Sequence, residues 1–246
     1  MTPIKTAIIG GSSLTTLEQL ENPKIITVDT EYGASPANIV TGEFNGSQVA
    51  FLARHGADYE TPPHLINYKA NIKALKDLGV EKILAVNTVG GIHPDMPAGA
   101  IVIPDQLIDY TWGRESTYSA QGNVIFIEFE QPFTETLRQG LLNAGTEAEI
   151  AVTDFGVYGC TQGPRLETAA EINRLERDGC DLVGMTASPE AALARELEID
   201  YASICLVVNP AAGRADRPIS MDEVAKVAAV GMVKVVQLLE QIVSKL

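Results

Sequence analysis

A glycine-rich turn near the start of the chain could bind an anion. The apolar run 6–9 leads directly into Gly10, Gly11 and Ser12. Glycines let backbone N–H groups come close to an anion, and a serine hydroxyl adds a hydrogen-bond donor. The turn matches neither the Walker pattern nor a complete dinucleotide fingerprint, so a tight turn without a ligand is an equal alternative.

Arg54 and His55 follow the apolar run 49–53. Ligands of α/β proteins collect beyond the carboxyl ends of the strands, and an arginine fork suits a phosphate, to which a neighbouring histidine can add a hydrogen bond. We therefore expect Arg54→Ala to lower turnover by orders of magnitude with little change in the fold. The alternative is a surface arginine paired with one of the many carboxylates.

Three further polar turns follow apolar runs in the same way. Each offers a hydroxyl or an amide at a strand end, and this repetition favours a common binding edge. Asn209 could read the edge of a ligand or merely satisfy its own turn. The turns are residues 87–91, which include Asn87 and Thr88; residues 184–190, which include Met185 and Thr186; and residues 209–213.

Common metal-binding and nucleophile patterns are missing from the sequence. It contains no HxxxH pair, no carboxylate cluster with metal-ligand spacing and no GxSxG motif. His64 and His93 are each more typical of surface residues than of ligands. We therefore expect no metal and no cofactor, with inorganic phosphate as a co-substrate.

The composition favours one soluble domain, residues 1–246. The chain is 46% hydrophobic, which allows a full-sized core, and its formal net charge of -14 disfavours nucleic-acid partners. We find no stretch typical of a membrane span or a signal peptide, so we expect no membrane partner. Single cysteines in apolar surroundings indicate reduced core residues and a cytoplasmic location: Cys160, Cys180 and Cys205.

Short apolar runs alternate with helical patterns and predict an α/β fold with a largely buried sheet. Helices are expected over 65–78, ended by Gly79; from Ser188 as N-cap; and from Ser220, where a capping box with Glu223 opens the last helix. The irregular stretch 112–131 is predicted to be a surface excursion. Buried strands are predicted at 6–9, 24–28, 49–53, 82–86, 100–103, 151–155 and 202–208.

Seven motifs, in order along nearly the whole chain, resemble the trimeric family of purine nucleoside phosphorylases and methylthioadenosine phosphorylases. The resemblance implies a single-domain α/β fold with a central mixed, partly barrel-like sheet flanked by helices. It also implies a metal-free homotrimer that transfers a pentosyl group to phosphate. The motifs are residues 10–12, 54–56, 67–71, 90–91, 99–109, 163–168, and 184–186 with Pro189 and Glu190.

The resemblance assigns roles by position. Arg54, His55 and Asn209 correspond to catalytic residues of the family. The phosphate site would comprise Ser12, Arg54, His55, Asn87, Thr88 and Thr186. The nucleoside site would comprise Tyr59, Glu167, Met185, Asn209, Ala211 and Met221.

Two comparisons within the family point to the substrate. Asn209 stands where adenine-specific members carry an aspartate, and together with Glu167 it implies a 6-oxopurine base. Met221 stands where ordinary nucleoside phosphorylases carry a histidine against the 5′-hydroxyl, and a thioether suits a methylthio group. The resemblance thus implies phosphorolysis of S-methyl-5′-thioinosine to hypoxanthine and 5-methylthioribose 1-phosphate.

Several alternatives remain open at this point. Glu167 could cap a helix, and Met221 could fill the core. The activity could be that of a methylthioadenosine phosphorylase or of a general 6-oxopurine nucleoside phosphorylase. A nucleoside- or anion-binding protein without catalysis could also share the fold.

Overall fold

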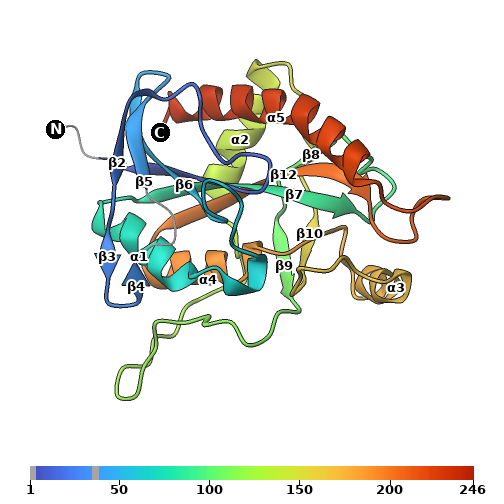
Figure 1. Cartoon of the computed structure of the whole chain (residues 1–246), viewed down its shortest axis with the longest axis horizontal. Coiled ribbons are helices and arrows are strands. Elements are labelled where there is room, and N and C mark those ends of the chain that lie inside the picture. The colour runs from blue at the N-terminus through green and yellow to red at the C-terminus, as the bar shows by residue number, and fades with distance from the viewer. Residues whose placement is uncertain (1–3, 35–38) are drawn as a thin grey trace.

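A computed structural model describes residues 4–34 and 39–246 (Figure 1). The described strands form a mixed ten-stranded sheet in the order β2-β5-β6-β1-β7-β11-β10-β9, with β12 and β8 branching from β7. Its strands are β1 Thr6–Gly10, β2 Glu21–Ile26, β5 Ile39–Phe44, β6 Ser47–Ala53, β7 Lys82–Gly91, β8 Ile101–Val102, β9 Gln106–Asp109, β10 Val157–Cys160, β11 Leu182–Gly184 and β12 Asp200–Pro210; β3 Asp29–Thr30 and β4 Gly33–Ala34 form a separate pair.

The four strands at the centre of the sheet run parallel. β1 lies between β6 and β7, and β12 pairs with β7 along nearly its whole length. The carboxyl ends of these strands therefore meet at one edge of the sheet, where polar turns from distant parts of the sequence come together. This arrangement confirms the predicted α/β class with a mixed central sheet.

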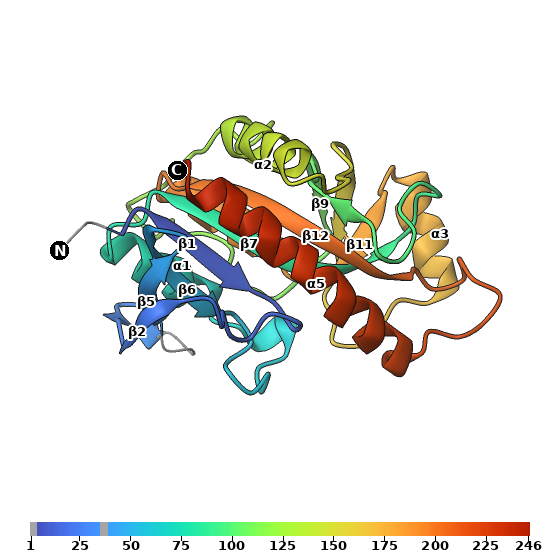
Figure 2. The same ribbon diagram turned by 90° about the horizontal axis from the view of Figure 1, so that it is seen from above.

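Helices cover both faces of the sheet. Along β1, Ile8 packs into the core beneath α2 and α5, while Ala7 and Ile9 pack toward α1 and α4, as the period of a strand requires (Figure 1). Seen from above, α5 crosses the parallel strands diagonally (Figure 2). The helices are η1 Pro63–Leu65, α1 Tyr68–Asp77, α2 Glu135–Glu147, α3 Ala169–Arg177, α4 Ala187–Glu196 and α5 Met221–Val243.

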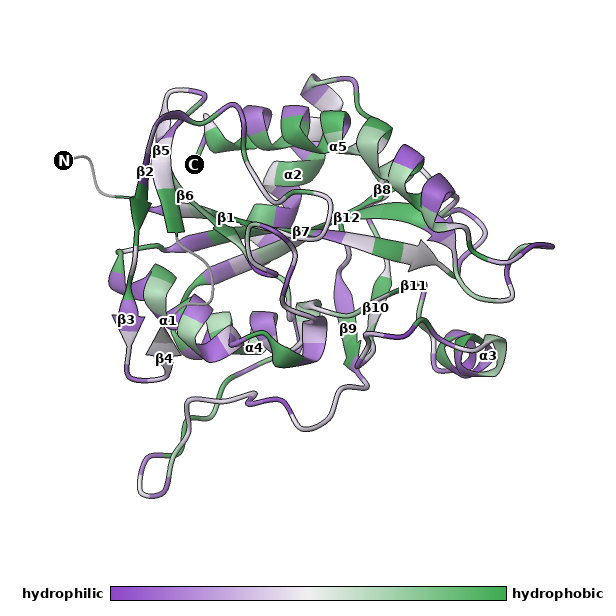
Figure 3. Ribbon diagram, in the orientation of Figure 1, coloured by the Kyte–Doolittle hydropathy of each residue, from purple (hydrophilic) through white to green (hydrophobic). Residues whose placement is uncertain are grey.

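The expected amphipathic last helix is confirmed. Apolar and polar bands alternate along α5 (Figure 3), and Met232, Val235 and Leu239 are buried on its inner side. Its expected capping box does not form, because Glu223 instead pairs with Arg217 at 2.9 Å.

Two other predicted helices also form, with one corrected start. α1 begins at Tyr68 rather than at residue 65, because Asn67 is its N-cap, and Gly79 follows it at φ +92°, a conformation that favours glycine. α4 is kinked at Ser188, whose extended backbone (φ −110°, ψ 135°) precedes Pro189 as an N-cap residue would, so the predicted helix start is confirmed. The Ser188 side chain makes no capping bond, because its hydroxyl donates to Asp109 at 2.6 Å.

Two of the seven predicted buried strands are corrected. Residues 24–28 overlap β2, but β2 is an exposed edge strand that pairs only with β5 among the described strands. Residues 151–155 form only an isolated bridge between Thr153 and Val102, because this stretch crosses the surface after α2. The sequence did not predict the strands β3, β4, β5, β9, β10 and β11 or the helices η1, α2 and α3.

The stretch 112–131 is an excursion, as predicted. It leaves the domain between β9 and α2 as an extended loop (Figure 1) and contains little regular structure beyond a bridge of Ala120 with Asn123. Among the described residues, no helix has the length and apolar character needed to cross a membrane.

Candidate active site

A cavity of about 280 Å³ opens at the carboxyl edge of the central strands. Its walls come from the turns after β1, β6, β11 and β12, from the last residues of β7 and β12, from the segment before α3, and from the start of α5. The turn predicted at 87–91 is wrong, because these residues continue β7 in its pairing with β12. All twelve residues that the sequence singled out line it: Ser12, Arg54, His55, Tyr59, Asn87, Thr88, Glu167, Met185, Thr186, Asn209, Ala211 and Met221.

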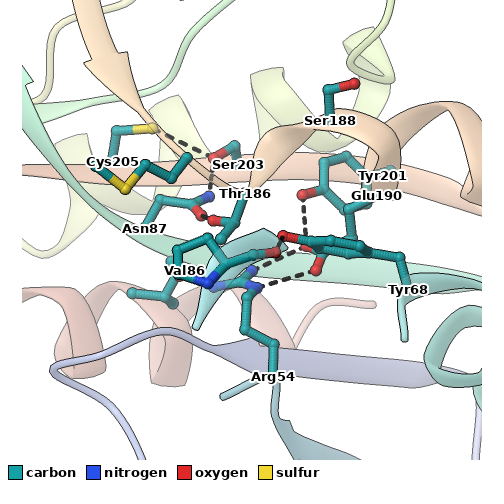
Figure 4. Close-up of polar contacts among 12 residues, drawn as sticks. Arg54, Tyr68, Val86, Asn87, Thr186, Ser188, Glu190, Tyr201, Ser203 and Cys205 are labelled. Carbon is teal, nitrogen blue, oxygen red and sulfur yellow. Dashed lines mark hydrogen bonds and ion pairs between the residues drawn. The ribbon is translucent and has the colours of Figure 1, made fainter. Parts of the chain in front are cut away.

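Arg54 lies at the floor of the cavity and forms a buried ion pair (Figure 4). Its Nε and Nη2 donate to the two carboxylate oxygens of Glu190 at 2.9 Å each, and Nη1 donates to the Val86 carbonyl at 2.8 Å. Burial lowers the pKa of Arg54, but the charge of Glu190 outweighs it and the pKa ends above its ordinary value. Each terminal nitrogen retains a second N–H, so the guanidinium can still donate to an anion.

The alternative of a surface arginine is therefore wrong, because Arg54 is buried. Its expected partner, a carboxylate, is confirmed. Arg54 has no exposed surface, and Glu190 is 1% exposed. Because Arg54→Ala would leave the Glu190 carboxylate unpaired in the core, we expect it to destabilise the fold rather than leave it almost unchanged.

The glycine turn after β1 packs against this arginine. A Cβ atom on Gly11 would lie 3.0 Å from Arg54 Nη1 and 2.9 Å from the Val86 carbonyl oxygen. The turn thus needs a glycine at this position because of close approach, and its position brings Ser12 to the rim of the cavity.

A chain of hydrogen bonds orients the hydroxyl of Thr186 (Figure 4). Thr186 Oγ1 donates to Asn87 Oδ1 at 2.7 Å, and Asn87 Nδ2 donates to Ser203 Oγ at 2.6 Å. Because the Thr186 proton is directed into the protein, its oxygen presents lone pairs to a ligand. Asn87 contributes here by orienting Thr186, and its own binding of phosphate stays a prediction.

Two hydroxyls face each other at the rim. Ser12 Oγ, in the turn after β1, and Thr88 Oγ1, on the neighbouring strand β7, are 3.0 Å apart. In such a pair one hydroxyl donates to the other, which leaves the second hydrogen free for an anion.

His55 is neutral in this environment. Burial and the neighbouring charge of Arg54 lower its pKa to about 4. Its Nδ1 lies 2.8 Å from the Thr61 carbonyl oxygen, which can only accept, so Nδ1 carries the proton and Nε2 carries a lone pair. His55 is therefore suited to accept a hydrogen bond from a protonated oxyanion through Nε2.

Glu167 and Asn209 line the same part of the cavity. Thr161 Oγ1 donates to Glu167 Oε1 at 2.6 Å, and Asn209 Nδ2 donates to the Pro210 carbonyl at 2.7 Å. The alternative in which Glu167 caps a helix is wrong, because Thr168 caps α3 in a capping box with Glu171.

Tyr59, Met185 and Met221 supply apolar surface to the cavity. Met221 is the first residue of α5 and is 66% exposed, so the alternative in which it fills the core is wrong. A larger cavity of about 690 Å³, between α5 and the stretch 208–220, adjoins the first at Glu167, Asn209 and Ala211, which line both.

The sequence did not reveal the residues that orient the site residues through hydrogen bonds. Glu190 belongs to the last of the seven motifs, but the sequence analysis assigns it no role. Its position in the first turn of the helix that follows Ser188 is the sequence signal that points to it. Tyr201 donates to Glu190 at 2.8 Å, and its partner lies on another element. Nothing local in the sequence singles out Tyr201, Ser203, Thr161 or Arg114.

The chain belongs to the phosphorylase superfamily, whose family model matches residues 5–244. It is thus an enzyme, a nucleoside phosphorylase that transfers a pentosyl group to phosphate.

Named relatives agree with this membership. The chain is 52% identical to a probable S-methyl-5′-thioinosine phosphorylase of Pseudomonas syringae pv. tomato, over 97% of this chain and 98% of that protein. It is 45% identical to a probable 6-oxopurine nucleoside phosphorylase of Dictyoglomus turgidum, over 99% and 92%. The solved methylthioadenosine phosphorylase of Schistosoma mansoni, in complex with adenine, superposes with a TM-score of 0.94 at 31% identity, covering 98% and 91%.

Proposed function

We propose that this protein catalyses phosphorolysis of a purine nucleoside and prefers S-methyl-5′-thioinosine. The observation that carries the proposal is one cavity in which an anion site, the pair Asn209 and Glu167, and the thioether of Met221 occur together. The products would be hypoxanthine and 5-methylthioribose 1-phosphate, which places the reaction in purine salvage.

The polar floor of the cavity would hold the phosphate. The remaining N–H groups of Arg54, the free hydrogen of the Ser12 and Thr88 pair and the lone pairs of His55 and Thr186 suit an oxyanion that carries a proton. Phosphate held beneath the ribose would attack C1′ as the bond to the base breaks, so catalysis rests on positioning and charge stabilisation.

Asn209 and Glu167 would bind the departing base. An amide can accept a hydrogen bond from a protonated N7 through its carbonyl and donate to O6 through its nitrogen, a pattern that matches hypoxanthine rather than adenine. The bond from Thr161 orients the Glu167 carboxylate, which leaves its other oxygen for a donor on the base.

Met221 would contact the 5′ substituent. A flexible thioether packs well against a methylthio group and offers no strong partner to a hydroxyl. The relatives at 52% and 45% identity carry names that refer to 6-oxopurine substrates, which supports the base assignment and leaves a general 6-oxopurine nucleoside phosphorylase as the second candidate.

We further propose that the chain, one domain over residues 1–246, works as a homotrimer in the cytoplasm. The excursion carries exposed apolar side chains, Trp112, Val124 and Phe126, which a neighbouring subunit would cover. The three cysteines are free and buried, in keeping with a reducing compartment.

The test measures phosphate-dependent release of the base from methylthioinosine, inosine and methylthioadenosine. We expect the highest kcat/KM with methylthioinosine. A preference for inosine would support the second candidate, and a preference for methylthioadenosine would overturn the base assignment. Binding of nucleosides without turnover would overturn the proposal as a whole.

A further inference from the structure

Arg114, at the root of the excursion, is bonded to backbone carbonyls on two loops of the active site. Its Nη1 donates to the carbonyls of Met185 at 2.8 Å and Ser188 at 2.6 Å. Its Nη2 donates to the carbonyls of Gln162 at 2.9 Å and Thr161 at 3.3 Å. One guanidinium thus joins the loop after β10 to the loop after β11.

Both loops present side chains to the cavity. The first begins with Thr161, which orients Glu167, and the second contains Met185 and Thr186. Because β10 and β11 are parallel neighbours, their loops leave the sheet side by side, and Arg114 connects them where the strand pairing ends.

The Arg114 guanidinium also packs against the side chain of Tyr68. Its Cζ lies 5.4 Å from the centre of the Tyr68 ring, and Nη1 reaches the Tyr68 hydroxyl at 3.3 Å. Among the described residues, no carboxylate lies within ion-pair distance of Arg114, so its hydrogen bonds are directed to the loops themselves.

We propose that Arg114 is a positioning residue for phosphorolysis: it sets the relative placement of Thr186 and Met185 on one loop and Glu167 on the other. Arg114 touches neither reactant and acts through the backbone of these loops. The inference rests on the function proposed above and extends it, because it ties the geometry of the site to the root of the excursion.

The experiment compares Arg114→Met with two matched variants in the full-length protein. Arg195→Met removes a different arginine that binds carbonyls of the same excursion, at Gln131 and Glu128, away from the cavity. Arg138→Met removes a buried arginine that binds the carbonyls of Pro104 and Asp154. The first control tests whether loosening the excursion alone lowers activity, and the second tests whether a loss of stability alone does so.

We expect Arg114→Met to lower kcat/KM for methylthioinosine by about 10- to 100-fold at a temperature where the variant is fully folded. Arg195→Met should lower it less than threefold, and Arg138→Met should lower Tm without a matching loss of activity in the folded protein. Millimolar guanidinium or methylguanidinium should restore part of the activity of Arg114→Met and of neither control.

Equal kcat/KM in Arg114→Met and the wild type, or a loss fully explained by the unfolded fraction, would overturn the inference. If Arg114→Met does not fold, Arg114→Lys decides: it should fold and lose at least fivefold, because an ammonium cannot span both loops, and wild-type activity in it would refute the role. An inactive wild type would instead contradict the proposed function, so the two failures are distinguishable.

Discussion

Arg54 and Glu190 form a two-point ion pair at the floor of the cavity, with both donor–acceptor distances at 2.9 Å. The pair joins the end of β6 to the first turn of α4, and Tyr201 adds a third hydrogen bond to the carboxylate. Arg54 is thus held in one orientation by the core while it faces the ligand. Its contributions to folding and to phosphate binding are therefore coupled.

Breaking this pair should destabilise the fold. We expect Arg54→Met and Glu190→Leu each to reduce the free energy of unfolding by about 3–5 kcal/mol, since each leaves a buried charge unpaired. The double variant should be more stable than either single one. Urea unfolding checks this, with the exposed pair of Arg174 and Asp178 as control, where Arg174→Met should cost less than about 1 kcal/mol.

The low pKa of His55 should make stability depend on pH. Its pKa is about 4 when folded and 6.5 when unfolded, so between these values the unfolded chain binds more protons and stability falls as the pH is lowered. The difference amounts to about 3 kcal/mol, fully lost below pH 4. Unfolding of wild type and His55→Gln from pH 4 to 8 isolates this contribution: equal slopes would contradict the low pKa.

Asn209→Asp should shift the base preference. A carboxyl at this position suits the exocyclic amine of adenine and repels the O6 of hypoxanthine. The ratio of kcat/KM for methylthioadenosine over methylthioinosine should therefore rise. The neighbouring Ala211→Ser offers a control that keeps the amide, and an unchanged ratio in Asn209→Asp would remove the basis of the base assignment.

Met221→His should act at the opposite end of the nucleoside. The imidazole gives the 5′-hydroxyl a hydrogen-bond partner and places a polar ring against the methylthio group. The ratio of kcat/KM for inosine over methylthioinosine should therefore rise by the equivalent of about 1–3 kcal/mol. Because Met221 is exposed, Tm should stay within a few degrees of the wild type. Its effect should add to that of Asn209→Asp, since the two sites share few contacts.

The excursion should be part of the subunit interface. Light scattering is expected to give about three times the chain mass of 26.3 kDa. Phe126, at 92% exposure, should be buried in the assembly, so Phe126→Ser should weaken association and lower activity at nanomolar protein. A fully active monomer would refute the trimer and its link to activity.

The sequence determined the strand-and-turn pattern that locates the site. Short β-branched runs followed by Gly11, Arg54 and Asn87 are local signals, and parallel strands align their carboxyl ends whatever the chain between them does. The seven motifs, taken in their order along the chain, identified the individual site residues, and all twelve of these residues line one cavity.

Tertiary structure decided how those residues are held. Glu190 lies 136 positions from Arg54, Ser203 lies 116 from Asn87, and Arg114 lies 71 from Met185. No local pattern encodes such contacts, because propensity and periodicity reflect neighbours along the chain. Short strands such as β10 and β11 form for the same reason: their stability comes from pairing with distant segments, and residues 151–155, with a similar apolar pattern, pair only through the single bridge of Thr153 with Val102 and stay irregular.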